Sequence, residues 1–105
     1  MIALALALLL QREPLPAYAD AGRCAGLSVA HHRALDDKAP QSRVAYDTAL
    51  FWSLAFSERA RKDKVAAVQF EKDLAAEAER AGKQLAAKEP GATAELARCA
   101  ARVPH

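Results

Sequence analysis

The sequence predicts an all-α protein, a small bundle of three to four helices with one disulfide joining the first and last helices. Alanine, the strongest helix former, is the commonest residue, and alternating Val, Ile and Thr or an Asn-Gly turn are absent. Prolines at positions 40, 90 and 104 divide the chain after residue 19 into segments that each have helical periodicity. Two cysteines lie near the two ends of that part of the chain.

The first nineteen residues are typical of a secretory signal peptide. Residues 2–10 are all apolar, a run that suits a signal but is well short of the roughly 20 residues of a membrane-spanning helix. Ala17 and Ala19 fit the small-residue cleavage pattern, so we expect cleavage after Ala19 and a single helical domain at residues 20–105, secreted or periplasmic, without a stable membrane span. No Lys or Arg precedes the apolar run, which leaves a start codon further upstream open. The alternative, a buried helix of the fold at residues 2–10, is less favoured.

The first helix is expected over residues 20–37, with Asp20 near its N-terminus, where a carboxylate can accept backbone N–H groups. One face of it carries residues spaced i, i+3, i+4 and i+7. These are Cys24, Leu27, Ser28, His31, Ala34 and Leu35. Residues 38–41 form the connection, and Ser42 is the expected N-cap of the next helix.

The second helix, expected over residues 42–57, holds the most apolar part of the domain. Its run is interrupted only by Ser53 and consists of Leu50, Phe51, Trp52, Leu54, Ala55 and Phe56. Apolar residues on most of a helix's circumference predict burial on several sides, between the other helices or between subunits.

Two further helices complete the predicted bundle. A single helix over residues 41–89 would be about 70 Å long, too long for a compact domain of this size, so a break is expected between Ser57 and Asp63. The third helix then covers residues 58–88, with a core stripe of Ala67, Phe70, Leu74, Ala78, Ala81 and Leu85. Pro90 and Gly91 predict a turn, and Thr93 would cap a fourth helix over residues 94–102. Its apolar face would consist of Leu96, Cys99, Ala100 and Val103.

A disulfide between Cys24 and Cys99 would close nearly all of residues 20–105 into one loop. Such a bond limits the conformations open to the unfolded chain and so stabilises a protein by roughly 4 kcal/mol. Two cysteines in an exported chain favour a structural bond, and without a C-x-x-C motif nothing indicates a reactive thiol. An intermolecular disulfide is the alternative.

Composition and charge exclude several classes of protein. With 15 Lys and Arg against 13 Asp and Glu, the net charge is +2, and 52% of the residues are hydrophobic. These values argue against a disordered acidic tail and a polybasic nucleic-acid arm. The densest basic run, Arg59, Arg61, Lys62 and Lys64, is interrupted by acidic residues and lacks aromatic neighbours. We interpret it as a solvated helix end and expect no nucleic-acid partner.

No pattern predicts a catalytic, cofactor or metal site. His31 and His32 are adjacent and therefore point about 100° apart on a helix, and Cys24 is assigned to the disulfide. Glu71 and Asp73 also point to different sides. Because phosphate loops and nucleophile motifs are absent as well, we expect no enzyme and no cofactor.

The sequence therefore predicts an exported, non-enzymatic helical protein with a binding or accessory role and an unidentified protein partner. A second hypothesis is a self-associating or chaperone-like structural protein. Its interaction surface would be the aromatic face of the second helix, formed by Leu50, Phe51, Trp52 and Phe56. A third hypothesis is an inhibitor of a secreted enzyme.

Overall fold

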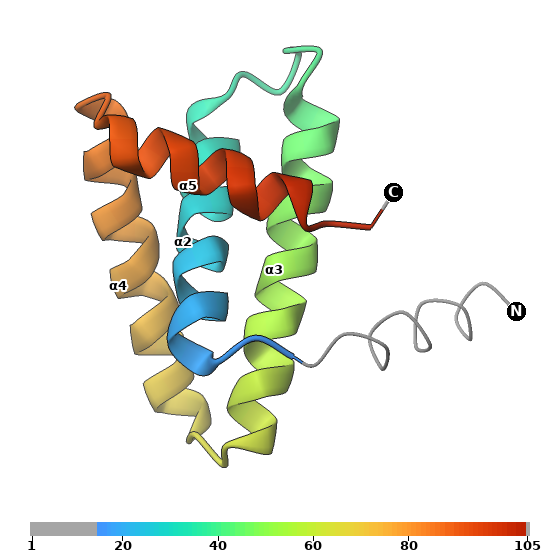
Figure 1. Cartoon of the computed structure of the whole chain (residues 1–105), viewed down its shortest axis with the longest axis vertical. Helices are drawn as coiled ribbons and strands as arrows, with labels where there is room; N and C mark the ends of the chain where they lie inside the picture. Colours follow the sequence, from blue (N-terminus) through green and yellow to red (C-terminus); the bar gives the residue numbers. More distant parts are fainter. Residues whose placement is uncertain (1–14, 105) are drawn as a thin grey trace, which may run out of the picture.

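The computed structural model describes residues 15–104, which form four helices and no strands (Figure 1). The helices are α2 (Tyr18–Ala34), α3 (Ser42–Lys62), α4 (Ala67–Ala86) and α5 (Pro90–Ala101). α2 lies between α3 and α4 and packs closely on both, and α5 crosses over α2 (Figure 1). The Cys24–Cys99 disulfide joins α2 to α5. The predicted all-α bundle with one disulfide between its first and last helices is thus confirmed over these residues.

α2 fits between two neighbours because most of its buried residues are small. They are Ala21, Gly22, Cys24, Ala25, Gly26, Leu27 and Ser28. Gly26 marks the closest approach, since a Cβ atom at this position would lie 2.6 Å from the backbone carbonyl of Glu77 in α4. The backbones of α2 and α4 therefore touch at a point where no other residue type fits.

The centre of the core is aromatic. Trp52 and Phe56 of α3 are each only 1% exposed. The Phe56 ring has the ring of Tyr18 at 4.6 Å and that of Phe70 at 4.9 Å, measured between centroids. Aromatic side chains from α2, α3 and α4 thus meet around Phe56, and burial of rings this large contributes much of the hydrophobic stabilisation of a small domain.

The break between the second and third predicted helices is misplaced in the sequence prediction. α3 continues five residues past position 57, to Lys62, and Ser57 is exposed within it rather than capping a new helix. Ala60 is buried at 4% exposure, and Glu58 pairs with Arg61 along the same helix. This hydrophilic run is therefore the last part of α3, because one residue in it is buried and its charges pair at helical spacing.

α3 and α4 end in the same way, with a lysine in the left-handed conformation. Lys64 has φ 58°, and the N–H of Val65 donates to the carbonyl of Ala60 at 2.9 Å. Lys88 has φ 57°, and the N–H of Glu89 donates to the carbonyl of Gln84 at 3.1 Å. Both are Schellman closures, which satisfy carbonyls that the helix end leaves free.

The ends of α2 and α5 also differ from the prediction. α2 spans residues 18–34 rather than 20–37, so Asp20 lies in its first turn and not at the cap. α5 begins at Pro90, not at 94, because a proline fits the first helical turn, where its missing N–H is not needed. On the predicted face of α5, Cys99 and Val103 are buried, and Leu96 and Ala100 are half-buried.

The predicted signal peptide lies mostly outside the described residues. Its proposed cleavage site after Ala19 falls within the first turn of α2. A chain that begins at Asp20 would lack Tyr18, together with its contacts to Phe56 and Asp73. Among the helices between residues 15 and 104, none combines the length and the apolar character needed to span a membrane.

Tyr18 gives a measurable signature of this N-terminal packing. Its hydroxyl donates to Asp73 Oδ2 at 2.7 Å, and desolvation, followed by this hydrogen bond to the carboxylate, raises the pKa of Tyr18 to about 12. In a Tyr46→Phe variant that retains residue 18, Tyr18 is the only tyrosine. We expect its tyrosinate absorbance to appear near pH 12 in the folded protein and near pH 10 in denaturant.

The same shift predicts a pH dependence of stability. The pKa of Tyr18 is higher in the folded state than in the unfolded state, so the protonated hydroxyl favours folding below pH 10. This contribution is lost as the pH rises from about 10 to about 12. A Tyr18→Phe variant should lack that part of the alkaline decline. Ionisation of folded Tyr18 near pH 10 would contradict the contact with Asp73.

Candidate functional site

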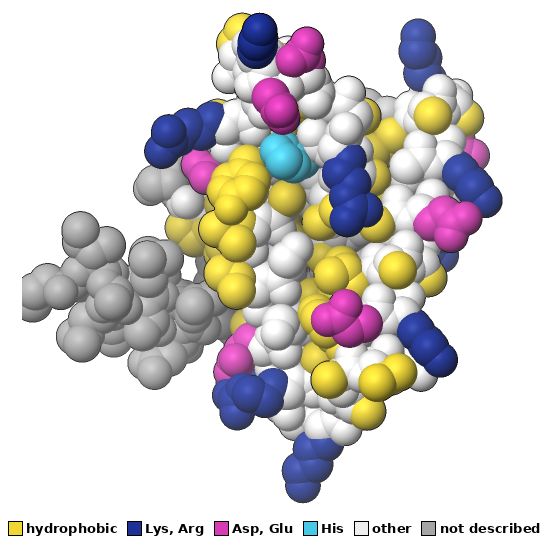
Figure 2. Space-filling view, turned by 180° about the vertical axis from the view of Figure 1, so that it is seen from behind, with side chains coloured by type: hydrophobic (Ala, Val, Ile, Leu, Met, Phe, Trp, Pro, Cys, Tyr) yellow, Lys and Arg dark blue, Asp and Glu magenta, His cyan; other side chains and the backbone are white. Residues whose placement is uncertain are grey.

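The outward face of α3 carries a contiguous apolar stripe, which we call the α3 surface and define as Tyr46, Leu50 and Leu54. These side chains are 52%, 45% and 62% exposed. Their i, i+4, i+8 spacing aligns them along one side of the helix, and Figure 2 shows apolar side chains gathered over α3. The rings of Tyr46 and His32 of α2 meet in a T-shaped arrangement, with their centroids 5.5 Å apart.

Charged residues stand at both ends of the α3 surface. Arg43 precedes its N-terminal end, Asp47 flanks it next to Tyr46, and Glu58 and Arg61 follow its C-terminal end. Glu58 accepts hydrogen bonds from Arg61, and these bonds lower the pKa of the Glu58 carboxyl. No carboxylate within residues 15–104 forms an ion pair with Arg43. The stripe is thus apolar in the middle and charged at its ends.

The interaction surface predicted from the sequence is divided by the fold. Trp52 and Phe56 are core residues at 1% exposure, and Phe51 is half-buried with its ring against Trp52 at 5.3 Å. Of the four residues predicted to form the interaction surface, only Leu50 is exposed. The reason is that α3 packs one face on α2, and residues 50 and 52 lie about 200° apart around a helix. Within one copy of the chain, the other helices therefore do not enclose α3, and burial between subunits stays a prediction.

Tyr46 and Leu54 are the surface residues that the sequence reasoning missed. Their regular spacing with Leu50, on the side of the helix opposite Trp52 and Phe56, was a usable signal. The run from Leu50 to Phe56 obscures this spacing, because it places apolar residues on most sides of the helix.

A cavity of about 280 Å³ opens between α2, α3 and α5. Its walls are mainly apolar and include Val44, Ala45 and Leu96, with the polar residues Ser28 and His31 among its lining. His31 lines this cavity whereas His32 contacts Tyr46, so the adjacent histidines point to different places, as predicted. In the part of the chain that the structure describes, no three His, Cys, Asp or Glu side chains are grouped to hold a metal ion.

Ser28 is the least satisfied polar group at this cavity. It is 1% exposed, and its Oγ has no hydrogen-bond partner. A buried hydroxyl without a partner costs stability, so we expect Ser28→Ala to raise the free energy of unfolding by about 1 kcal/mol in chemical denaturation. Ser57→Ala, at an exposed site on α3, is the control and should gain only about 0.3 kcal/mol from helix propensity. A loss of stability in Ser28→Ala would contradict this account of the hydroxyl.

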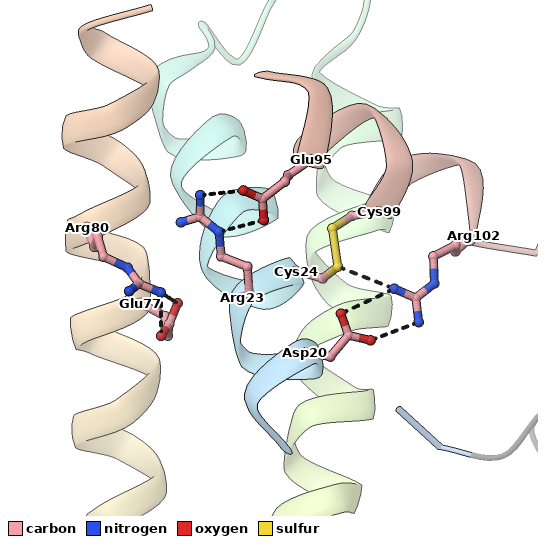
Figure 3. Close-up of polar contacts among 8 residues, drawn as sticks. All are labelled: Asp20, Arg23, Cys24, Glu77, Arg80, Glu95, Cys99 and Arg102. Carbon is pink, nitrogen blue, oxygen red and sulfur yellow. Dashed lines mark hydrogen bonds and ion pairs between the residues drawn. A yellow bond between two sulfur atoms is a disulfide. The ribbon is translucent and has the colours of Figure 1, made fainter. Parts of the chain in front are cut away.

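The junction of α2 with α5 contains the disulfide and two arginine–carboxylate pairs (Figure 3). Arg23 donates to both carboxylate oxygens of Glu95, at 3.0 and 3.2 Å, and these bonds lower the pKa of the Glu95 carboxyl. Arg102 pairs with Asp20 at 3.1 Å on the other side of the disulfide. The junction therefore fastens two helices together, and both cysteines are consumed in the bond.

Trp52 ties α3 to the same junction. Its indole N–H donates to the backbone carbonyl of Cys99 at 3.0 Å, and the Arg102 guanidinium lies 4.8 Å from its ring centroid. The buried indole thus has a hydrogen-bond partner and a cation over its face, both of which favour its position.

The remaining candidates do not form a site. Of the basic run, Arg59 pairs with Asp63 and Arg61 with Glu58, and Lys62 and Lys64 are exposed. Asp73 accepts a hydrogen bond from the Tyr18 hydroxyl, whereas Glu71 is exposed, so the two carboxylates are not brought together for acid–base chemistry.

No protein-family model matches the chain, and no curated protein or solved structure is significantly similar to it.

Proposed function

We propose that this chain is an exported, disulfide-stabilised protein without enzymatic activity, which binds a protein partner through the α3 surface. The observation that carries the proposal is the exposure of Tyr46, Leu50 and Leu54 side by side on one rigid helix. Single apolar residues are common on protein surfaces, but a contiguous group of large ones is typical of an interaction site.

Export is supported by the Cys24–Cys99 disulfide together with the signal-like N-terminal sequence. Disulfides persist in oxidising compartments and are rare in the reducing cytosol. The test is to express the whole chain with a C-terminal tag, separate the cell fractions and measure intact mass and free thiols. We expect a chain beginning at Asp20, outside the cytoplasm, with no free thiol. A full-length cytoplasmic chain with two reactive thiols would refute export.

The binding role is tested by cross-linking and co-purification from the native compartment. Leu50→Glu with Leu54→Glu places two charges on the α3 surface and should abolish recovery of the partner. Val68→Glu is the control, because Val68 is 68% exposed on α4 and does not belong to the α3 surface. Equal recovery with both variants would exclude the α3 surface as the binding site.

A further inference from the structure

We propose that the partner of the α3 surface is a second copy of this chain, docked antiparallel about a twofold axis beside Leu50. This inference rests on the proposed binding role of that surface and names its occupant. It is supported by the apolar and the charged residues of α3, which indicate the same axis independently.

The apolar residues are arranged symmetrically along α3. Tyr46 lies four residues before Leu50 and Leu54 four residues after it, about 6 Å to either side along the helix axis. A twofold axis perpendicular to α3 at Leu50 brings that residue against Leu50 of the partner subunit. It also brings Tyr46 against Leu54 of the partner subunit, so each exposed apolar side chain is covered by another.

The charges at the two ends give nearly the same register. Arg43 lies seven residues before Leu50 and Glu58 eight residues after it. In the antiparallel pair, Arg43 is therefore about one residue, or roughly 1.5 Å, from the level of Glu58 of the partner subunit. Arg43 and Glu58 both point to the same side of the line through Tyr46, Leu50 and Leu54, which we call one flank of the stripe. The twofold axis places this flank of one α3 next to the same flank of the other.

A parallel pair would place these charges differently. Arg43 would then lie at the level of Arg43 of the partner subunit, and Glu58 at the level of Glu58 of the partner subunit, so neither would have an opposite charge at its level. Within residues 15–104 Arg43 has no ion-pair partner, and the carboxylate of Glu58 can accept a hydrogen bond beyond those from Arg61. The charges therefore select the antiparallel orientation.

The opposite flank allows two helices to approach. It carries Ser53 and Ser57, whose small side chains neither project far nor add charge. One helix face buries a small area compared with the roughly 800 Å² per partner that a standard stable complex buries. Association should therefore be reversible and depend on protein concentration.

The test uses two variants of the chain, each with one charge reversed and each purified from cells that export it. The homodimer has two symmetry-related contacts between position 43 of one subunit and position 58 of the other. In the Arg43→Glu variant both contacts join two acidic residues, and in the Glu58→Arg variant both join two basic residues. An equimolar mixture can form a heterodimer in which both contacts are again between opposite charges. Sedimentation over a concentration series measures association in each sample.

We expect the wild-type chain to form dimers reversibly, and each variant alone to associate at least about tenfold more weakly. The mixture should return to within about threefold of the wild type, with heterodimers predominating. The control variants, Glu79→Lys and Lys83→Glu, reverse an exposed ion pair on α4 and should behave as the wild type.

Other results would overturn the proposal. A wild-type chain that stays monomeric at all concentrations rules out a second copy as the occupant. Dimerisation that the mixture fails to restore rules out the antiparallel register, and association unaffected by Leu50→Glu places the contact elsewhere. The broader binding role fails only if co-purification of a different protein is also unaffected by the double variant Leu50→Glu with Leu54→Glu. Failure of self-association and failure of the proposed function are therefore distinguishable.

Discussion

Replacing Cys24 and Cys99 with alanine is expected to lower the free energy of unfolding by about 4 kcal/mol, the largest effect of any change considered. The two residues are 75 positions apart, so their bond removes a large part of the freedom of the unfolded chain. Small domains have total stabilities of about 5 to 15 kcal/mol, so the variant should be only marginally folded. Urea denaturation followed by helical circular dichroism measures the difference.

The control for the cysteine variant is the wild-type chain after reduction, which loses the cross-link without losing side-chain volume. Both samples should unfold at similar, lower urea concentrations. The Arg23–Glu95 and Arg102–Asp20 pairs remain in both and are partly or largely exposed, so they should compensate little. A loss below about 1 kcal/mol would show that the helices hold together without the bond.

Gly26→Ala is expected to lower the free energy of unfolding by about 3 kcal/mol, because the added methyl group would overlap backbone atoms of Glu77. Backbone cannot move aside as a flexible side-chain end can, so α2 and α4 must separate. Chemical denaturation gives the free energy, and hydrogen exchange along α4 shows whether that helix is loosened.

The matched control is Gly82→Ala, on α4 and facing α2. A Cβ atom at residue 82 would meet only the side chain of Ala30, at 3.9 Å, which is ordinary contact. We expect this variant to gain up to about 1 kcal/mol, since alanine is the better helix former. Equal effects at Gly26 and Gly82 would contradict a backbone contact confined to Gly26.

The fold class could be predicted because it depends on local features of the chain, and the disulfide because of the number of cysteines. Helix formers and prolines specify helices and their limits, and two cysteines permit only one intramolecular pair. The end of α3 could not be placed, because Ser57 and Glu58 are good local signals for a new helix. Burial of Ala60 and ion pairs along α3 override those signals, and the burial is not visible before the helices are packed.

The candidate site was only partly predictable for a similar reason. The apolar run identified α3 as the important helix, but the face that becomes core depends on where α2 lies. Gly26 carried no sequence signal beyond poor helix propensity, yet it is the point that lets α2 approach α4. The position of α2 between two helices thus decides both which aromatics are buried and which leucines remain exposed.

The Cys24–Cys99 bond also determines how the molecule would respond to mechanical tension. A pull on the two ends of the chain enters at the start of α2 and at the end of α5, and the covalent bond between those helices carries the load. Residues 25–98 lie outside the force path, so α3 and α4 would not be stretched while the bond is intact. Of residues 15–104, only those before Cys24 and after Cys99 could then extend under force, and the α3 surface would keep its shape.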